Sequence, residues 1–121
     1  MSARDAENLR EFLVESRENL DRMEAELVVL ERDPGAGEPL ASIFRALHTI
    51  KGVAGFLELG GVGRLSHTGE NLLTRLRDRE LRFTPALASL LLRLVDALRE
   101  ALLHLEAHGR EPEGGYPALE A

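Results

Sequence analysis

Cysteine and tryptophan are absent from this chain of 121 residues, and no stretch approaches the roughly 20 apolar residues of a membrane span. Without cysteine there is no disulfide framework, no thiol nucleophile and no thiolate metal site. The first ten residues carry acidic side chains and no apolar core, which argues against a signal peptide. The length fits one domain, and we expect a cytoplasmic protein without membrane insertion.

The chain also lacks an excess of positive charge: 21 acidic residues outnumber 15 basic ones, and the formal net charge is −6. A nucleic-acid-binding domain needs a basic surface to neutralise phosphates, so we expect no nucleic-acid partner. The acidic residues concentrate in residues 5–33, whereas residues 40–82 are mildly basic. Lys51 is the only lysine among 15 basic residues. Because a lysine ammonium and an arginine guanidinium are not chemically interchangeable, Lys51 is a candidate functional residue.

Apolar residues recur at alternating steps of three and four along four stretches of the chain, which predicts amphipathic helices. These helices are expected at about residues 6–32, 40–58, 62–79 and 85–108. Pro39 marks the start of the second, and glycines at 60 and 61 mark its end. Thr84 is the expected N-cap of the fourth, which Gly109 stops. No stretch shows a strand pattern.

Four such helices joined by short loops predict an all-α, antiparallel, up-down-up-down four-helix bundle with a leucine-rich core. We assign the bundle to residues 1–109. Residues 110–121 are rich in Pro and Gly and are expected to be a linker, although 117–121 could also begin a fifth helix.

The second expected helix contains two internal glycines, Gly52 and Gly55. Each should cost about 0.5–1 kcal/mol relative to alanine, so a packing or access reason is expected. At about 100° per residue, His48 lies at the edge of the buried stripe with both glycines at neighbouring angles and Lys51 one turn away. We therefore expect an accessible imidazole on a bare helix face that a large partner can approach.

The third expected helix returns antiparallel, which brings residue 48 level with about residue 69. His67 and Glu70 bracket that level, and Glu70 is expected to lean toward the same surface groove as His48. A carboxylate beside an imidazole can accept the N–H of one ring nitrogen and leave the other as a nucleophile. In this constellation Lys51 could contact phosphoryl oxygens, and His67 could hydrogen-bond either partner.

The pattern resembles the signature of histidine phosphotransfer domains, most closely the N-terminal domain of CheA-type chemotaxis histidine kinases, over about 110 residues. Its two halves are His48-Thr49-Ile50-Lys51-Gly52 and, one hairpin later, His67-Thr68-Gly69-Glu70-Asn71-Leu72-Leu73. Either half alone is a weak signal, whereas the two together at this spacing are specific. Val53 departs from the small residue expected there. It faces away from His48, so little functional consequence is expected.

The resemblance implies that His48 accepts a phosphoryl group from a separate ATP-binding kinase domain and passes it to a response-regulator aspartate of the CheY or CheB kind. It implies that Glu70 orients His48 while Lys51 and His67 complete the network. ATP and Mg²⁺ would be bound by partner domains, and this domain would need no cofactor. No nucleotide-cradling glycine loop occurs, so we expect no enzyme activity from the domain alone. The parent protein would be an ATP-dependent protein histidine kinase.

Two other interpretations remain open from the residues. His48, His67 and Glu70 are acceptable zinc ligands, but bundle metal sites usually point inward and Lys51 would repel a cation. Alternatively, the exposed face is a helical docking module without phosphoryl chemistry, which explains the glycines but not Lys51 or Glu70.

The remaining candidates have structural explanations. His104 and His108 are expected on the surface and in the last turn of the fourth helix, and Asn71 is expected to face solvent. The aromatic residues Phe44, Phe56 and Phe83 are expected to pack in the core or at the hairpin.

Overall fold

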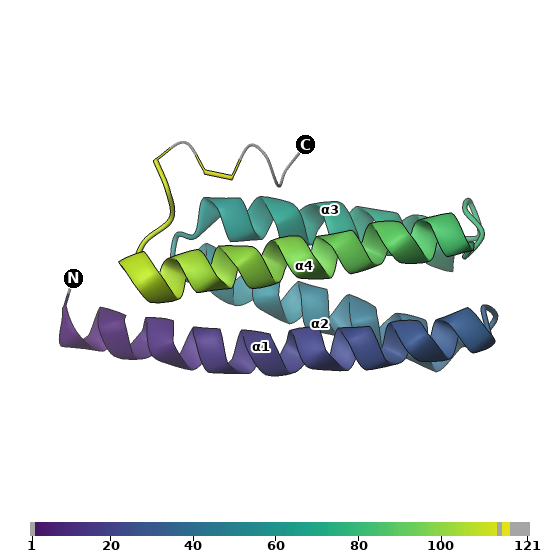
Figure 1. Ribbon diagram of the computed structural model, residues 1–121, viewed down its shortest axis with the longest axis horizontal. Coiled ribbons are helices and arrows are strands. Elements are labelled where there is room, and N and C mark those ends of the chain that lie inside the picture. Colours follow the sequence, from purple (N-terminus) through teal and green to yellow (C-terminus); the bar gives the residue numbers. More distant parts are fainter. Residues whose placement is uncertain (1, 114, 117–121) are drawn as a thin grey trace.

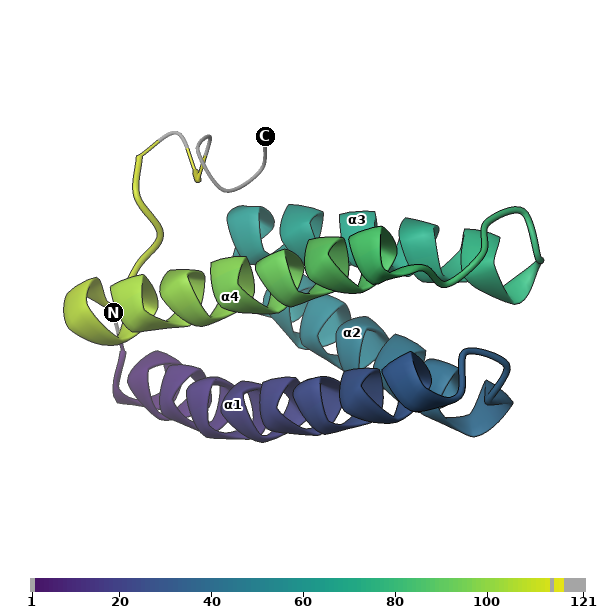
Figure 2. The same cartoon turned by 45° about the vertical axis from the view of Figure 1, so that its right-hand side comes forward.

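The computed structural model describes residues 2–113, 115 and 116, which form four helices: α1 (Ala3–Arg32), α2 (Gly37–Phe56), α3 (Gly60–Arg77) and α4 (Pro85–His108). Successive helices run in opposite directions (Figure 1). Each helix packs against two neighbours, so that α1, α2, α3 and α4 form a closed ring around one core. Figure 2 shows the same ring from a second direction. The predicted antiparallel four-helix bundle is confirmed.

The core is built from the apolar stripes that the periodicity predicts. One cluster of buried side chains runs through all four helices, and its largest fully buried members are Leu20, Met23, Leu27, Leu30, Ile43, Leu47, Ile50, Leu73, Leu91, Leu98, Leu102 and Leu105. Ion pairs link α1 to α4 outside this core: Arg99 reaches Asp21 at 2.8 Å, and Arg17 pairs with Glu106. In the part of the chain that the structure describes, none of the four helices has the length and hydrophobicity of a transmembrane span.

Helix starts follow the local capping chemistry. Ser2 and Asp5 form a reciprocal capping box, so α1 begins at Ala3, earlier than its apolar stripe predicted. At α4 the Thr84 hydroxyl accepts the backbone N–H of Leu87 at 3.2 Å, as the sequence predicted. Helix α2 begins two residues before Pro39, with a backbone N-cap that has no side-chain hydrogen bond.

Two helices end earlier than predicted, and the same backbone motif ends both. After α2, Glu58 has a positive φ of 60°, and the N–H of Leu59 donates to the Ala54 carbonyl at 2.8 Å. After α3, Arg79 has a φ of 62° in the equivalent position. This left-handed C-terminal cap usually carries glycine, so non-glycine residues in it gave no signal in the sequence. The α2–α3 reversal nevertheless takes three residues, within the predicted two or three.

The segment after α4 contacts the beginning of α3. Both carboxylate oxygens of Glu111 accept backbone N–H groups, from Gly61 and from Val62, each at 2.9 Å. Tyr116 is buried against the same turn, where a Cβ on Gly61 would lie 2.5 Å from the tyrosine ring. Part of the segment expected to be a linker therefore packs on the bundle. The fifth helix suggested for residues 117–121 lies outside the described residues.

Candidate functional site

The structure brings His48, Lys51 and Glu70 together across the α2–α3 pair. The Nδ1 atom of His48 lies 3.4 Å from Oε1 of Glu70, and Nζ of Lys51 lies 3.0 Å from Oε2 of the same carboxylate. His48 and Lys51 come from adjacent turns of α2, whereas Glu70 comes from α3, as the antiparallel register predicted. The Glu70 carboxylate thus contacts both His48 and Lys51, the two side chains of the first half of the signature.

Glu70 differs from its expected place in one respect. The sequence predicted a side chain in an open surface groove, but Glu70 is only 7% exposed. The preceding residue explains this burial: a Cβ on Gly69 would contact Leu94 and would lie 2.7 Å from Cδ1 of Leu47. Because Gly69 has no side chain, α3 packs closely on its neighbours, and the Lys51 and His48 side chains cover Glu70. Oε1 of Glu70 makes no hydrogen bond within the described residues, and His48 is the ionisable group that faces it.

His48 combines an exposed ring with a fixed environment on one side. Its side chain is 67% exposed, although Nδ1 faces a buried carboxylate. The ring of Phe44, one turn earlier on α2, stacks on the imidazole with 6.2 Å between centroids and 9° between planes. The guanidinium of Arg77, the last residue of α3, lies 5.6 Å from the centroid of the Phe44 ring. Offset stacking in this distance range is favourable, so Phe44 restricts the tilt of an imidazole that is otherwise largely exposed. Phe44 was expected to pack in the core or at the hairpin; it packs partly against the core and also against the ring of His48.

Gly52 and Gly55 leave the surface beside His48 bare. A Cβ added at either position would meet no atom within 4 Å, and both glycines are exposed. Neither glycine has a positive φ. Packing and backbone conformation therefore do not require glycine here, which leaves access to His48 as the physical reason that fits.

His67 is placed differently from the expectation that it bonds to Glu70 or His48. It is exposed, and among the described residues it makes no hydrogen bond or ion pair. It lines a shallow cleft between α2 and α3 together with Lys51, Gly55, Gly63 and Arg64. His67 therefore shares a cleft with Lys51, and its contribution to the network stays a prediction.

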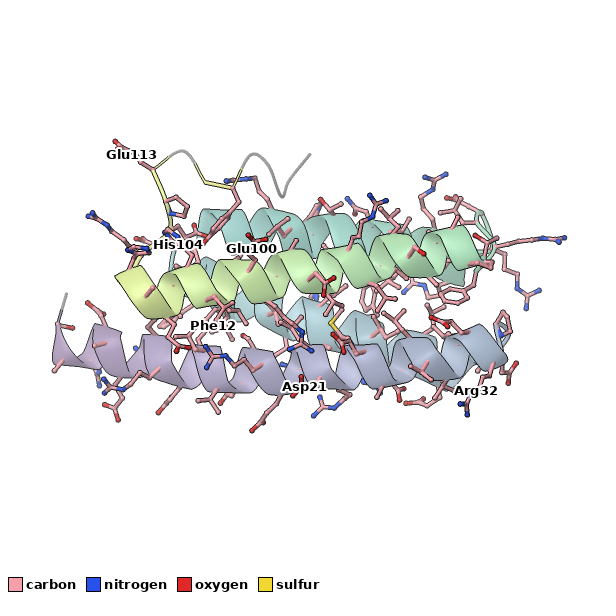
Figure 3. All side chains as sticks on the ribbon, viewed as in Figure 1. Phe12, Asp21, Arg32, Glu100, His104 and Glu113 are labelled. Atoms are coloured by element: carbon pink, nitrogen blue, oxygen red, sulfur yellow. The ribbon has the colours of Figure 1, made fainter. Side chains whose placement is uncertain are left out.

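Four further residues were assigned a place from the sequence, and two of these predictions were right while two were wrong. Asn71 is exposed, as expected, and so is His108. His104 is half-buried because its ring packs edge-on to Tyr116 with 6.1 Å between centroids; Figure 3 labels it on α4 where the tail leaves the helix. Phe56 was expected in the core or the hairpin, but it is 78% exposed. It ends α2 on the outer side of the helix, so neither neighbouring helix covers it.

The metal interpretation finds no support in the geometry. Across residues 2–113, 115 and 116, no group of three or more His, Asp or Glu side chains is arranged to hold a metal ion. His48 and Lys51 already occupy opposite oxygens of Glu70. Chemically, the arrangement suits an imidazole whose Nδ1 faces a carboxylate while the rest of its ring is open to solvent.

Comparison with known proteins agrees with this geometry. Residues 7–101 match the family model of the Hpt domain. The chain belongs to the Hpt domain family. The prediction of a histidine phosphotransfer domain is therefore confirmed.

Relatives of this Hpt domain are chemotaxis kinases. It is 34% identical over 109 residues to the sensor histidine kinase CheAY of Helicobacter pylori, covering 90% of this chain and 14% of that protein. Among solved structures it is similar to the CheA phosphotransferase domain of Thermotoga maritima, with a TM-score of 0.80, 32% identity and coverage of 87% and 98% of the two chains. The phosphorylated P1 domain of CheA3 from R. sphaeroides, solved in complex with CheY6, gives a TM-score of 0.84 at 31% identity, with 95% and 91% covered.

Proposed function

We propose that His48 is the phosphoacceptor of this Hpt domain and that Nε2 is the atom that carries the phosphoryl group. The observation that carries the proposal is the asymmetry of the ring: Nδ1 lies 3.4 Å from the buried Glu70 carboxylate, whereas the side chain as a whole is 67% exposed. A carboxylate at Nδ1 favours the tautomer with its hydrogen there. The lone pair on Nε2 is then free to attack.

The reaction we propose is an in-line displacement on the terminal phosphoryl group of ATP, held by a separate kinase domain. A bond forms between Nε2 of His48 and the γ-phosphorus, and the bond from that phosphorus to the β,γ-bridging oxygen breaks, which leaves ADP. The imidazole gains positive character in this step, and the negative charge of Glu70 stabilises it. Mg²⁺ and the nucleotide belong to the kinase domain, so this chain supplies the nucleophile and its orientation.

Lys51 has two roles in this proposal. Before phosphorylation its ammonium pairs with Oε2 of Glu70 at 3.0 Å, which holds the carboxylate in place. After phosphorylation new negative charge lies one helical turn away, and the ammonium can turn toward the phosphoryl oxygens. His67 lines the same cleft as Lys51, and we assign it a supporting position in the hydrogen-bonded network of the phosphorylated state.

We propose two partners: a histidine kinase catalytic domain that phosphorylates His48, and a receiver domain whose aspartate accepts the group. The related P1 domain of CheA3 was solved in its phosphorylated form with CheY6, which supports a receiver of the CheY type; a CheB-type receiver is a second candidate. This chain spans 14% of the CheAY protein. The ATP-dependent kinase activity of a longer parent protein is accordingly part of the proposal, as is a cytoplasmic location, where ATP is available.

The decisive experiment is phosphorylation in trans. The chain is incubated with labelled ATP, Mg²⁺ and a CheA-type kinase core that lacks its own phosphotransfer domain. We expect label that is stable in base and lost in acid, as for phosphohistidine, and we expect His48→Gln to take up none. His104→Gln is the matched control, because it changes a histidine far from the site, and it should label like the wild type. Unchanged labelling of His48→Gln, or no labelling of the wild type, would overturn the proposal.

A further inference from the structure

Phe56 is the one large aromatic side chain among the described residues that neither the core nor the proposed chemistry uses. It is the last residue of α2, and 78% of its surface is exposed. Aromatic rings usually contribute to a fold by being buried, so a ring in water at this place needs another explanation. Exposed aromatic side chains beside a functional site are common anchors of protein–protein interfaces.

Phe56 follows His48 on the exposed side of α2, eight residues later and turned by about 80° around the helix axis at about 100° per residue. His48, Gly52 and Phe56 follow one another at steps of four residues and form a row, here called the outer row, on one side of the helix. At 1.5 Å of rise per residue, Phe56 lies about 12 Å along the axis from His48. The middle position is bare, since a Cβ on Gly52 would meet nothing within 4 Å. A flat surface therefore connects the reacting histidine to the aromatic ring.

The outer row lies within the area that any partner reacting with His48 must cover. Transient signalling interfaces bury about 600 Å² on each partner, which corresponds to a disc of about 14 Å radius. A disc of that size centred on His48 reaches Phe56. No acidic residue occurs between Pro39 and Leu57, so the row also offers no charge that would repel the acidic pocket of an acceptor aspartate.

We propose that Phe56 is the apolar anchor by which a receiver domain docks on this chain, with Gly52 keeping the surface between anchor and phosphohistidine flat. The inference rests on the proposed function and adds the docking residue and the chemistry of its pocket. The receiver should present an apolar pocket about 12 Å from its acceptor aspartate. We assign the row to the receiver because a related phosphorylated P1 domain, which matches 95% of this chain, forms a complex with CheY6.

The test measures transfer from the phosphorylated chain to a CheY-type receiver that accepts label from the wild type. Transfer rates are recorded over a range of receiver concentrations, for wild type, Phe56→Ala and Phe56→Tyr. We expect Phe56→Ala to raise the half-saturating receiver concentration roughly 10- to 30-fold while the rate at saturation stays within twofold. Phe56→Tyr keeps the ring and should stay near the wild type.

Leu103→Ala is the matched control, because Leu103 is 62% exposed on α4, away from α2. It should leave both parameters unchanged. Helix content, followed by circular dichroism, should be the same for all variants, since neither side chain supports the core.

Wild-type saturation behaviour in Phe56→Ala would overturn the docking role and leave the proposed function intact. A defect only in phosphorylation by the kinase core would also overturn it, since the kinase would then be the partner on this row. Failure of the wild type to transfer label to any receiver would overturn both.

Discussion

At the scale of single residues, the site depends on one carboxylate with two neighbours. Glu70 approaches Nδ1 of His48 with one oxygen and Nζ of Lys51 with the other, and it is nearly buried while it does so. Its burial matters because the charge acts through less water than a surface carboxylate would. The nearly buried Glu70 carboxylate thus orients the exposed imidazole of His48, the proposed nucleophile.

Glu70→Gln should separate chemistry from stability. The amide keeps the shape and one acceptor oxygen but removes the charge that stabilises the imidazolium-like product, so we expect phosphorylation to slow by about tenfold or more. Lys51 is 30% exposed and can turn to water, so the free energy of unfolding should change by about 1 kcal/mol or less. Rates of phosphohistidine formation and urea unfolding measure the two effects.

The matched control for this change is Glu24→Gln, which alters an ion-paired carboxylate that lies 3.1 Å from Arg99, far from His48. It should leave the rate of phosphorylation unchanged. A Glu70→Gln rate equal to that of the wild type would remove Glu70 from the mechanism. A large loss of stability with an unchanged rate would give it a purely structural role.

The helix glycines predict stability changes of opposite sign. Gly52→Ala adds a methyl group where nothing lies within 4 Å, so better helix propensity should stabilise the chain by about 0.5–1 kcal/mol. Gly69→Ala places the methyl group against Leu94 and Leu47, and overpacking should destabilise it by about 1–3 kcal/mol. Urea unfolding of both variants is the measurement, and changes of the same sign would contradict the assignment of Gly52 to access and Gly69 to packing.

At the scale of elements, the segment after α4 acts as a cap for α3. Glu111 satisfies two of the backbone N–H groups that every helix leaves free at its start, and its charge is favourable at the positive end of the helix dipole. Tyr116 then covers Gly61, which has no side chain in the way. This cap joins residues about 50 positions apart in the sequence, so it ties the end of the described chain to the hairpin that carries the site.

Tyr116, the tyrosine of this segment, should lose its proton at a higher pH than an exposed tyrosine does. Burial, and then the charge of Glu111, raise the pKa of Tyr116 to about 12 from an ordinary value of 10.0. Between about pH 10 and pH 12 the unfolded chain loses this proton first, so the free energy of unfolding should fall as the pH rises through that window. Tyr116 is the only tyrosine, and there is no tryptophan, so tyrosinate absorbance reports this group alone.

We therefore expect a spectroscopic midpoint near pH 12 in the folded chain and near pH 10 in concentrated urea. Tyr116→Phe should lack the fall in stability across this window, and Glu111→Gln should lower the midpoint because it removes the neighbouring negative charge. A folded-state midpoint near pH 10 would show that Tyr116 is not held against α3.

The helices themselves were largely predictable, because their signals are local. Thr84 and Gly109 set the limits of α4 where the sequence placed them. The ends of α2 and α3 were missed by about two residues, because Glu58 and Arg79 occupy the left-handed cap that glycine usually marks. The capping role of Glu111 was not predicted either, since no periodicity connects a residue in a Pro- and Gly-rich tail with a helix start 50 residues earlier.

At the scale of the whole molecule, one core joins the four helices and the tail. Tyr116 belongs to the same buried cluster as the leucines of all four helices. We therefore expect a single cooperative unfolding transition. Helix circular dichroism and Tyr116 fluorescence should give the same urea midpoint within error, and a tyrosine signal that changes at lower urea would mean that the tail separates before the bundle unfolds.

The bundle and the place of its site followed from the sequence because antiparallel hairpins have a simple register. Once the α2–α3 turn was located, residue 48 had to lie near residue 69, which brought His48 and Glu70 together. The register could not predict how deeply each side chain is buried. Burial of Glu70 depends on how closely three helices approach at Gly69, and exposure of Phe56 depends on where α2 stops, and both are properties of packing rather than of sequence spacing.

The scarcity of lysine has a practical consequence for labelling chemistry. Besides the N-terminal amine, Lys51 carries the only primary amine of the chain, and it lies beside the proposed nucleophile. An amine-selective acylating reagent would therefore place a single side-chain tag at this site without any engineering. Protection of that amine by a bound partner would report occupancy of the His48 surface directly, and faster acylation in Glu70→Gln would report release of the ammonium from its carboxylate.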